Sequence, residues 1–314
     1  TAGVGNTASG FSALYWNTTG DANSAYGYMA LYDNETGYEN SATGGFTLYG
    51  NITGYQNTAT GYKALFGNTT GHQNTATGYK VLTDNTTGHS NTASGYLALM
   101  SNTTGYNNTA IGYRALTTNT TGHKNTAIGY GADVGANNLE NATAVGNQAL
   151  VDASNKVRIG DTAVTVIEGE VAFTSSSDAR LKDSITPVSD GLALVNDLNP
   201  VRYHRTNNPE SDIEMGLLAQ EVEETLEKHG LGNSGMVHQP TKDSYMSLRY
   251  NDLLAPMIRA IQELDDAAEA KDLQIAALEQ RLRSQQEELL AVVQNQQEQI
   301  VQLQRTVEHQ FASR

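Results

Sequence analysis

A motif that recurs every 17 residues constrains what the N-terminal half of this 314-residue chain can fold into. The tetrapeptide Asn-x-Thr-Gly occurs at that step at 17–20, 34–37, 51–54, 68–71, 85–88, 102–105 and 119–122. A second motif, Asn-(Ser/Thr)-Ala-x-Gly, keeps the same step, with its glycines at Gly10, Gly27, Gly44, Gly61, Gly78, Gly95, Gly112 and Gly129, and Gly146 continues the series. A fixed period of this kind indicates one structural unit stacked on itself.

The unit is too short for a helical pair, and glycine recurs too often for helices. Two glycine-containing turns joined by short strands predict one coil of a parallel β-solenoid, or β-roll, with about nine coils over residues 1–150. We expect Asn and Gly to supply the positive-φ positions of the turns. The recurring alanines and leucines should point into an interior of Ala, Thr and Gly, namely Ala59, Ala76, Ala93 and Ala110 with Leu65, Leu99 and Leu116.

Aromatic and imidazole side chains also recur in register. A tyrosine follows the motif glycine at Tyr28, Tyr62, Tyr79, Tyr96, Tyr113 and Tyr130, and we interpret this row as packing between coils or subunits rather than as ligand binding. His72, His89 and His123 follow the turn glycine, where other coils carry Asp or Tyr. Three copies in a trimer could face one ion, but a position that accepts Asp and Tyr is typical of an exposed turn. We therefore predict no metal site and no cofactor.

The repeats resemble the head repeats of trimeric autotransporter adhesins, which are left-handed parallel β-rolls. NTAIGYRAL and NTAIGYGAD are the segments closest to that pattern, and the likeness covers about residues 1–160. The thin interior predicted for one coil fits the resemblance, because three chains side by side would supply the missing core. The expected stalk is therefore trimeric.

Charge and composition exclude several classes of function. The net charge is −15, from 7 acids and 4 bases in residues 1–150 and 27 acids and 15 bases in 151–314. An acidic chain does not suit nucleic-acid binding, which needs Lys and Arg against phosphates. The sequence has no cysteine and no apolar run long enough for membrane insertion. No pair of carboxylates recurs in the repeats, so glycan cleavage there is not expected.

The second half carries four motifs in a fixed order. They are SDARLKDSI at 177–185, LNPVRYH at 198–204, EMGLLAQEVEETL at 214–226 and YNDLLAPMIRAIQEL at 250–264. Together they resemble the endosialidase-type intramolecular chaperone peptidases of phage tailspikes and tail fibres, over about residues 172–265. The resemblance implies a small, trimeric α/β domain at 177–260 that cuts itself from the stalk. Residues 151–176, where Val and Ile alternate, would form closing strands and a cleavage linker.

The resemblance assigns Ser177 as the nucleophile and Lys182 as its base, with the scissile bond between Ser176 and Ser177. A lysine titrates near 10.4 in water, so it becomes a base at neutral pH only when burial disfavours its charged form. A spacing of five places the two side chains about 140° apart on an ideal helix. A turn must bring them together, or Lys182 must serve a neighbouring subunit.

The same segment also has a purely structural interpretation. SDARLKD can begin a helix, with Asp178 as its N-cap and with Arg180 and Lys182 on a solvated face. His204 and His238 could assist catalysis, although nothing local singles them out. We interpret Glu221, within Ala-Gln-Glu-Val, as structural.

Residues 261–314 predict a coiled coil. Apolar residues alternate at steps of three and four, at Ile261, Leu264, Ala268, Ile275, Leu278, Leu282, Leu289 and Val292, and continue one position later at Val293, Ile300, Leu303 and Val307. That change of phase is a stutter, which locally unwinds a supercoil. Lys271, Gln285 and Gln296 fall at core positions. Three strands are implied by the stalk and the resemblance, not by the heptads.

These features predict a phage tail-fibre or tailspike-type protein, located in the virion or outside the cell. Its C-terminal region would drive homotrimerisation and folding of the stalk and then release itself by cleavage between Ser176 and Ser177. The partner of the stalk would be a host-surface glycan or receptor. Two alternatives remain open: a bacterial trimeric surface adhesin, and a Thr-rich β-solenoid that binds glycans or ice.

Overall fold

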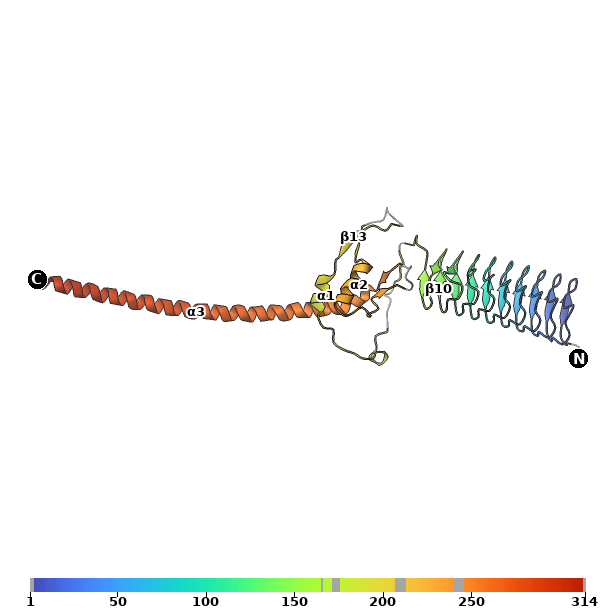
Figure 1. Cartoon of the computed structure of the whole chain (residues 1–314), viewed down its shortest axis with the longest axis horizontal. Helices are drawn as coiled ribbons and strands as arrows, with labels where there is room; N and C mark the ends of the chain where they lie inside the picture. The colour runs from blue at the N-terminus through green and yellow to red at the C-terminus, as the bar shows by residue number, and fades with distance from the viewer. Residues whose placement is uncertain (1–2, 165, 171–175, 207–212, 240–244, 313–314) are drawn as a thin grey trace. The chain divides into compact units, whose positions relative to one another are not determined.

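The computed structural model describes the chain except for residues 1–2, 165, 171–175, 207–212, 240–244 and 313–314. The chain divides into two compact units. The repeat unit is built on residues 1–174, and the α/β unit is formed by residues 175–203, 213–238 and 246–314. Figure 1 shows the repeats as successive coils and the C-terminal segment as one long helix.

Each repeat contributes one three-residue strand to a parallel sheet, in the order β1-β2-β3-β4-β5-β6-β7-β8-β10-β12. The strands are β1 (Thr7–Ser9), β2 (Ser24–Tyr26), β3 (Ser41–Thr43), β4 (Thr58–Thr60), β5 (Thr75–Thr77), β6 (Thr92–Ser94), β7 (Thr109–Ile111), β8 (Thr126–Ile128), β10 (Thr143–Val145) and β12 (Val157–Ile159). The pairing is in register with the repeat, so that Ala59 pairs with Ala76 and Ala76 with Ala93. A second parallel pair joins β9 (Asp133–Val134) to β11 (Leu150–Val151). The predicted parallel β-solenoid is confirmed.

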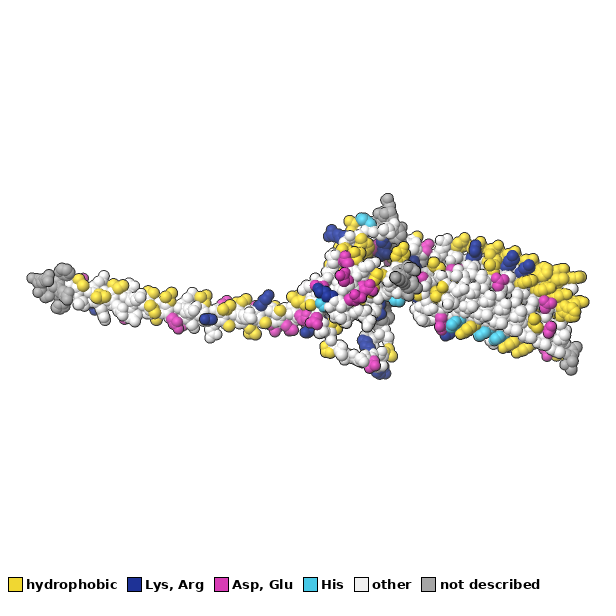
Figure 2. All heavy atoms as spheres, in the orientation of Figure 1, with side chains coloured by type: hydrophobic (Ala, Val, Ile, Leu, Met, Phe, Trp, Pro, Cys, Tyr) yellow, Lys and Arg dark blue, Asp and Glu magenta, His cyan; other side chains and the backbone are white. Residues whose placement is uncertain are grey.

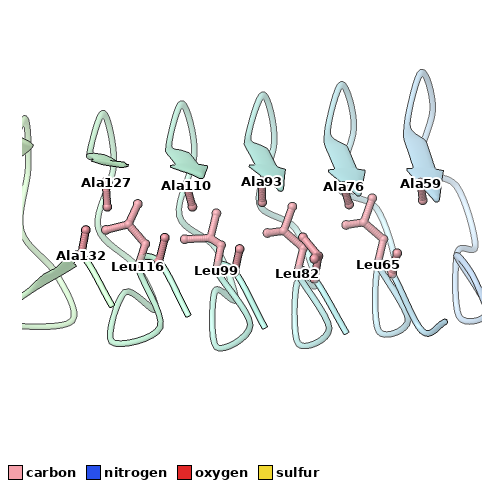
Figure 3. Packing of buried hydrophobic residues seen from close by; sticks show 14 of the residues in the cluster. Ala59, Leu65, Ala76, Leu82, Ala93, Leu99, Ala110, Leu116, Ala127 and Ala132 are labelled. Atoms are coloured by element: carbon pink, nitrogen blue, oxygen red, sulfur yellow. The ribbon is translucent and has the colours of Figure 1, made fainter. Parts of the chain in front are cut away.

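The interior of the coils is lined by alanine and leucine from opposite walls. Ala59, Ala76, Ala93 and Ala110 point inward from the strands, and Leu65, Leu99 and Leu116 point toward them from the facing loops (Figure 3). All of them are at most 1 % exposed. The inward orientation predicted for both residue types is confirmed. The threonines that flank the strand alanines face outward instead, as in the exposed–buried–exposed pattern of β4 and β5, so the predicted Thr lining is wrong for the strands. Thr47, outside the strands, is fully buried.

Asparagines form a first ladder through the repeat unit, and all of them are fully buried except Asn17 in the first coil, which is partly buried. Asn68 donates from Nδ2 to Oδ1 of Asn51 at 2.7 Å and to the carbonyl of Gly71 at 2.9 Å, while its own Oδ1 accepts from Asn85. The same pattern links Asn17, Asn34, Asn51, Asn68, Asn85, Asn102 and Asn119. Each side-chain amide therefore satisfies the hydrogen-bonding groups of its neighbours in an interior from which water is excluded.

A second ladder runs parallel to the first and uses the asparagine that precedes each strand. Asn74 donates its backbone N–H to Oδ1 of Asn57 at 3.0 Å and its Nδ2 to the carbonyl of Gly88 at 2.9 Å. Equivalent bonds join Asn23, Asn40, Asn57, Asn74, Asn91, Asn108 and Asn125. The two motif asparagines thus occupy the interior and bind one coil to the next.

The positive-φ positions differ from the prediction. The glycine of the strand motif does lie there, as at Gly61 with φ 125°, but the asparagines of both ladders do not. Lys63, Leu65 and Gln73 take up left-handed conformations, with φ of 56°, 52° and 55°. Their amides donate to adjacent coils, Lys63 to Gly45, Leu65 to Val81 and Gln73 to Tyr55, at 3.0 Å each. A left-handed residue costs about 1–2 kcal/mol, and here it turns an N–H toward the neighbouring coil.

The glycine of Asn-x-Thr-Gly has a different role from a turn glycine. A Cβ on Gly71 would collide with Oδ1 of Asn68, with Nδ2 of Asn85 and with the carbonyl of Gly88. Its backbone is not in the left-handed region. Glycine is required there because the asparagine ladder approaches the backbone closely.

Aromatic rings stack along the outside of the repeat unit in columns. Tyr62, Tyr79, Tyr96, Tyr113 and Tyr130 follow one another with ring centroids 4.9–5.6 Å apart. Another column contains Tyr38, Tyr55, His72, His89, Tyr106 and His123, at 4.6–5.0 Å. Histidine and hydrophobic side chains can be followed along one edge in Figure 2. The predicted packing of the tyrosines between coils is confirmed.

Only part of the segment 151–176 forms strands. Val151 ends β11, and β12 follows at Val157–Ile159. The described residues 160–164 and 166–170 form no strand, and residues 165 and 171–175 lie outside the described part.

The α/β unit contains short elements followed by one long helix. After a single 3-10 turn, η1 (Ala179–Leu181), come α1 (Gly191–Asp197), β13 (Val201–Tyr203), β14 (Glu214–Gly216), α2 (Ala219–Lys228), β15 (Val237–His238), β16 (Ser247–Leu248), η2 (Tyr250–Leu253) and α3 (Leu254–Ala312). β13 pairs antiparallel with β14, and β15 with β16. The buried core consists of Leu194, Val222, Leu226 and Met236.

Three of the sequence motifs meet in this unit. Gly216 of β14 faces the hydroxyls of Tyr203 and Tyr250. A Cβ on Gly216 would lie 2.6 Å from the hydroxyl oxygen of Tyr250. Tyr250 accepts a hydrogen bond from the N–H of Leu217 at 3.0 Å. The motif tyrosines and the motif glycine are therefore parts of one contact.

Helix α1 is held against the start of α3. Gly191 packs directly on α3, where a Cβ would lie 2.7 Å from the backbone of Pro256 and Ala260. Oε2 of Glu263 accepts from the N–H of Leu192 at 2.7 Å, and this bond is the largest cause of the lowered pKa of Glu263. Glu263 thereby caps α1 from the neighbouring helix.

Along its length α3 exposes a row of large apolar side chains. Ile261, Leu264, Leu278, Leu282 and Leu289 are each more than 50 % exposed. Their number exceeds the scattered apolar residues that are normal on a surface. No helix in the part of the chain that the structure describes combines the length and hydrophobicity that crossing a membrane requires.

A first prediction tests the asparagine ladder. Asn85→Asp keeps an acceptor for Asn102 but replaces the two N–H donors to Asn68 and Gly88 with a buried carboxylate facing acceptor oxygens. We expect a loss of roughly 2–4 kcal/mol of stability. It would be measured as a lower midpoint and faster unfolding of the β signal in circular dichroism.

The matched control is Asn107→Asp. Asn107 is exposed and left-handed, with φ 54°, a conformation that both Asn and Asp tolerate. This substitution should change the free energy of unfolding by less than about 0.5 kcal/mol, so the unfolding midpoint should stay nearly the same. Equal effects of the two substitutions would contradict the role assigned to the ladder.

A second prediction concerns pH. Asp197 at the end of α1 accepts from Nζ of Lys228 and from Nε2 of His229, each at 2.7 Å, and these hydrogen bonds, Lys228 first, lower its pKa. A carboxyl group whose pKa is lower in the folded than in the unfolded chain stabilises the fold at pH values above its unfolded pKa. This stabilisation is lost as the pH falls through its folded pKa. Asp197→Asn should therefore lower the unfolding midpoint at pH 7, and the difference from the wild type should shrink below about pH 4.

The measurement is helical circular dichroism of the full chain against temperature between pH 3 and pH 7. Glu224→Gln, an exposed change on α2, serves as the control and should leave the midpoint unchanged at every pH. If Asp197→Asn lowered the midpoint equally at pH 3 and pH 7, the effect would not arise from the charge.

Candidate functional site

The first sequence-predicted site lies on the single turn η1. Asp178 is its N-cap, and Oδ1 of Asp178 accepts from the N–H of Arg180 at 2.9 Å. The guanidinium of Arg180 also pairs with Oδ2 of Asp178 at 2.6 Å, and the hydrogen bonds from this side chain are the main cause of the lowered pKa of Asp178. Lys182 ends the turn by donating its N–H to the carbonyl of Ala179 at 3.1 Å. The capped start that the structural interpretation predicted is present, as a 3-10 turn.

The turn places Lys182 beside Ser177. After Leu181 the backbone of Lys182 is extended, at φ −120° and ψ 140°, so the helical spacing that would separate the two residues does not apply. Nζ of Lys182 lies 2.8 Å from Oγ of Ser177, in hydrogen-bonding contact within one chain. Of the two routes open to the sequence, the structure contains the local one.

Both side chains are exposed in the single chain, as are Ser176 and Asp178. A lysine that contacts a serine hydroxyl can hold that oxygen in place, and in its neutral form it can take the hydroxyl proton. Ser177 is itself the residue that follows the carbonyl of Ser176. The arrangement therefore brings together a hydroxyl, an amine and a peptide bond that the hydroxyl can reach.

The segment that follows the turn lies along the first turns of α3. Pro187, Val188 and Ser189 line an open, mainly apolar groove together with Ala255, Ile258, Arg259 and Gln262 of α3. From there the chain enters α1, where the N–H of Leu192, its second residue, donates to Glu263. Only a few residues of chain therefore connect the site turn, which ends at Leu181, to a segment that lines this groove with α3.

The other candidates lie elsewhere in the fold. Glu221 accepts from Nδ2 of Asn199 at 3.1 Å and so links α2 to the segment before β13, in agreement with its structural interpretation. His238 lies on β15, where its carbonyl accepts from the hydroxyl of Ser247 at 3.2 Å, and His204 follows β13. Sequence reasoning missed Glu263 and Asp197, which join elements far apart in the chain and carry no local signal.

The histidines of the repeat unit belong to the stacked aromatic column. His72 and His89 lie 4.8 Å apart, and desolvation together with His72 lowers the pKa of His89. His123 lies 3.1 Å from Glu140. Within the described residues, no three His, Asp or Glu side chains are grouped in a way that could hold a metal ion.

Comparison with known proteins identifies one part of the chain. No curated protein and no solved structure matches the chain significantly. Residues 177–231 match the family model described as Chaperone of endosialidase. The match begins at Ser177 and includes the site turn, α1, the pairing of β13 with β14, and α2. After a parallel β-solenoid of 17-residue repeats, this chain thus carries a segment, residues 177–231, that matches the endosialidase chaperone family.

Proposed function

We propose that this chain is a phage tail-fibre or tailspike-type protein. Its α/β unit and long helix act as an intramolecular chaperone that trimerises and folds the β stalk. It then releases itself by cutting the chain between Ser176 and Ser177. The observation that carries the proposal is the 2.8 Å contact between Nζ of Lys182 and Oγ of Ser177, at the first residue of the matched segment.

The proposed reaction starts with an acyl shift. Oγ of Ser177 attacks the carbonyl carbon of Ser176 while Lys182 takes the hydroxyl proton. The C–N bond breaks, the nitrogen of Ser177 receives a proton, and the two residues are joined by an ester. Water then hydrolyses the ester to the carboxylate of Ser176 and the free hydroxyl of Ser177, whose amino group is the new N-terminus.

Assembly would control this reaction through solvation. In the single chain Lys182 is exposed to water, which favours the charged form of an amine. Trimerisation would bury the turn and favour the neutral form that can act as a base. Cleavage would then follow correct assembly rather than precede it.

The long helix supports the trimeric part of the proposal. Its row of apolar side chains from Ile261 to Val307 follows heptad spacing and has no partner within the chain among the described residues. An isolated helix of 59 residues with this pattern gains stability by packing on copies of itself. A C-terminal trimer would raise the effective concentration of the three stalk chains, whose long-range pairing is slow.

A third prediction tests the cleavage. Wild-type protein should yield fragments 1–176 and 177–314, and Ser177→Ala or Lys182→Met should remain full length, as read by intact-mass spectrometry. Ser176→Ala is the matched control: it leaves the reacting carbonyl in place and should still be cut. Hydroxylamine should accelerate cleavage of the wild type, because it attacks the ester. A folded, trimeric wild type that remains intact would rule out the peptidase assignment.

A fourth prediction tests the chaperone role. Residues 1–176 expressed alone should be aggregated or monomeric, whereas the same residues released after folding with 177–314 should be trimeric and slow to unfold. The reason is that the barrier to unfolding, rather than the equilibrium, protects an assembled stalk.

Size-exclusion chromatography with light scattering compares the two preparations. Leu278→Asp with Leu282→Asp, in the full chain, should disrupt the helical trimer and give the same defect as the truncation. A stable stalk trimer obtained from 1–176 alone would reduce the C-terminal region to an oligomerisation domain.

A further inference from the structure

A row of basic side chains follows the tyrosine column of the middle repeats. Lys63, Lys80 and Arg114 each come directly after a column tyrosine, at the same position of the fourth, fifth and seventh coils. The backbone N–H of each donates to a carbonyl of the preceding coil. Figure 2 shows basic side chains set among hydrophobic ones along one edge of the repeat unit. The basic tyrosine edge consists of these three bases and of Tyr62, Tyr79, Tyr96 and Tyr113.

The middle repeats differ in charge from the rest of this acidic chain. The whole chain has 19 Lys and Arg against 34 Asp and Glu. Residues 40–132 contain a single acid, Asp84, and four bases, namely Lys63, Lys80, Arg114 and Lys124. Lys124 pairs with Glu140 at 3.1 Å, whereas the three bases of the edge have no ion-pair partner among the residues that the structure describes. Their charge is therefore available to a ligand.

Neighbouring rings hold two of the ammonium groups in place. Nζ of Lys63 lies 4.9–5.6 Å from three ring centroids. One of these rings is that of Phe46, which joins the tyrosine column to Tyr49 of a second column. Nζ of Lys80 lies 5.5 Å from the ring centroid of Tyr79. A cation is attracted to the face of an aromatic ring, so these contacts orient a long side chain without neutralising its charge.

The tyrosines supply a row of phenol hydroxyls beside the bases. Tyr62, Tyr79, Tyr96 and Tyr113 are 40–43 % exposed, and their rings stack with centroids 5.2–5.6 Å apart. Stacking covers the ring faces and leaves mainly the edges and hydroxyls to solvent. In the described part of the chain, none of these hydroxyls has a hydrogen-bond partner. The edge therefore presents one free hydroxyl at each coil.

The coil requires neither residue type at these positions. Gly45 and Asn147 stand where the other coils have the column tyrosine. Leu97 and Gln148 stand where they have the base. Gln148 has the same left-handed backbone, with φ of 51° against 56° at Lys63, and its N–H also donates to the preceding coil, at 2.7 Å. Because the coil forms without them, the repeated pairing of tyrosine and base needs a separate explanation.

The basic tyrosine edge does not suit a contact between copies of the chain. In a symmetric trimer, a face at the threefold axis meets the same face of the other copies. Three sets of bases would then come together with only one acid for each set. Like charges that are brought together disfavour such a contact. The edge therefore faces outward in the proposed trimer.

We propose that the basic tyrosine edge binds an anionic polysaccharide that lies along the stack of coils. The ammonium and guanidinium groups pair with its carboxylates or phosphates, and the tyrosine hydroxyls bond with its sugar hydroxyls. A polymer suits the edge because both repeat along one direction, so that successive coils add contacts. The inference rests on the proposed function, in which the stalk meets a glycan of the host surface, and it names the charge class of that glycan.

Isothermal titration calorimetry of the full chain tests this site with defined probes. Oligogalacturonate carries carboxylates, phosphomannan carries phosphodiesters, and maltoheptaose is a neutral saccharide. We expect saturable binding of at least one anionic saccharide, the better of the two identifying the anionic group, and no binding of maltoheptaose. Raising the NaCl concentration from about 50 mM to about 500 mM should weaken the binding about tenfold or more, because salt screens exposed charges.

The charge contribution is tested by Lys63→Gln combined with Lys80→Gln. This double variant should weaken the binding of the anionic saccharide about tenfold or more. Glutamine is chosen because Gln148 shows that the coil accepts it at this position. Lys124→Gln, which removes a base outside the edge, is the control and should change the affinity less than about twofold.

The hydroxyl contribution is tested by Tyr96→Asn, which leaves the charge unchanged. Asparagine already stands at the equivalent position of a later coil, at Asn147. The variant should weaken the binding about threefold to tenfold, as the loss of one hydrogen bond does. Circular dichroism and light scattering of every variant show whether the fold and the oligomeric state are kept.

The proposal is overturned if neither anionic saccharide binds, or if maltoheptaose or polyglutamate binds as tightly. Binding by the double lysine variant at the wild-type affinity also contradicts it. A change of oligomeric state in that variant would make the edge a contact between copies instead. Self-cleavage is read separately, from the masses of 1–176 and 177–314, so a failure of cleavage and a failure of glycan binding are distinct outcomes.

Discussion

The hydrogen-bonded stacking of buried asparagines is the interaction on which the repeat unit depends. Two amides per coil lie in an interior that holds little else than alanine and leucine, and each is paired with the coil before and after it. A single coil whose strand side contributes only alanine to the interior buries too little apolar area to be stable alone. The ladders explain why the repeat is kept to 17 residues: a different length would move an amide away from its partner and leave it buried without one.

The α/β unit has the opposite character. Its own core is small, with Leu194, Val222, Leu226 and Met236 buried, while α3 exposes a long apolar row. A small core beside a long exposed apolar row is what the proposed trimerisation would require. Glu263 ties α1 to the same helix, so the proposed assembly of α3 would be linked to the ordering of the segment behind the site turn.

The difference between the two units sets the order of the proposed steps: assembly of the C-terminal region, folding of the stalk, and cleavage. The stalk has a repetitive architecture whose coils are hydrogen-bonded to their neighbours, and pairing of this kind is slow to nucleate. A helix forms quickly because its contacts are local in sequence. In the proposed order of events, a cut between Ser176 and Ser177 after assembly would leave the slow-forming part without the route by which it formed.

The sequence by itself determined the period, the parallel solenoid, the inward Ala and Leu, and the family resemblance that the match confirms over residues 177–231. It did not show that Asn68 and Asn74 are interior, that Leu65 is left-handed, or that Phe46 joins two aromatic columns. A period states which residues are equivalent, but the direction of each side chain depends on hydrogen bonds between coils 17 residues apart. Likewise, Lys182 follows Ser177 by five positions in any conformation. Their side chains meet only because the turn capped by Asp178 stops after three residues. Lys182 then has an extended backbone, and its Nζ reaches Oγ of Ser177, whereas a continued helix would point the two side chains apart.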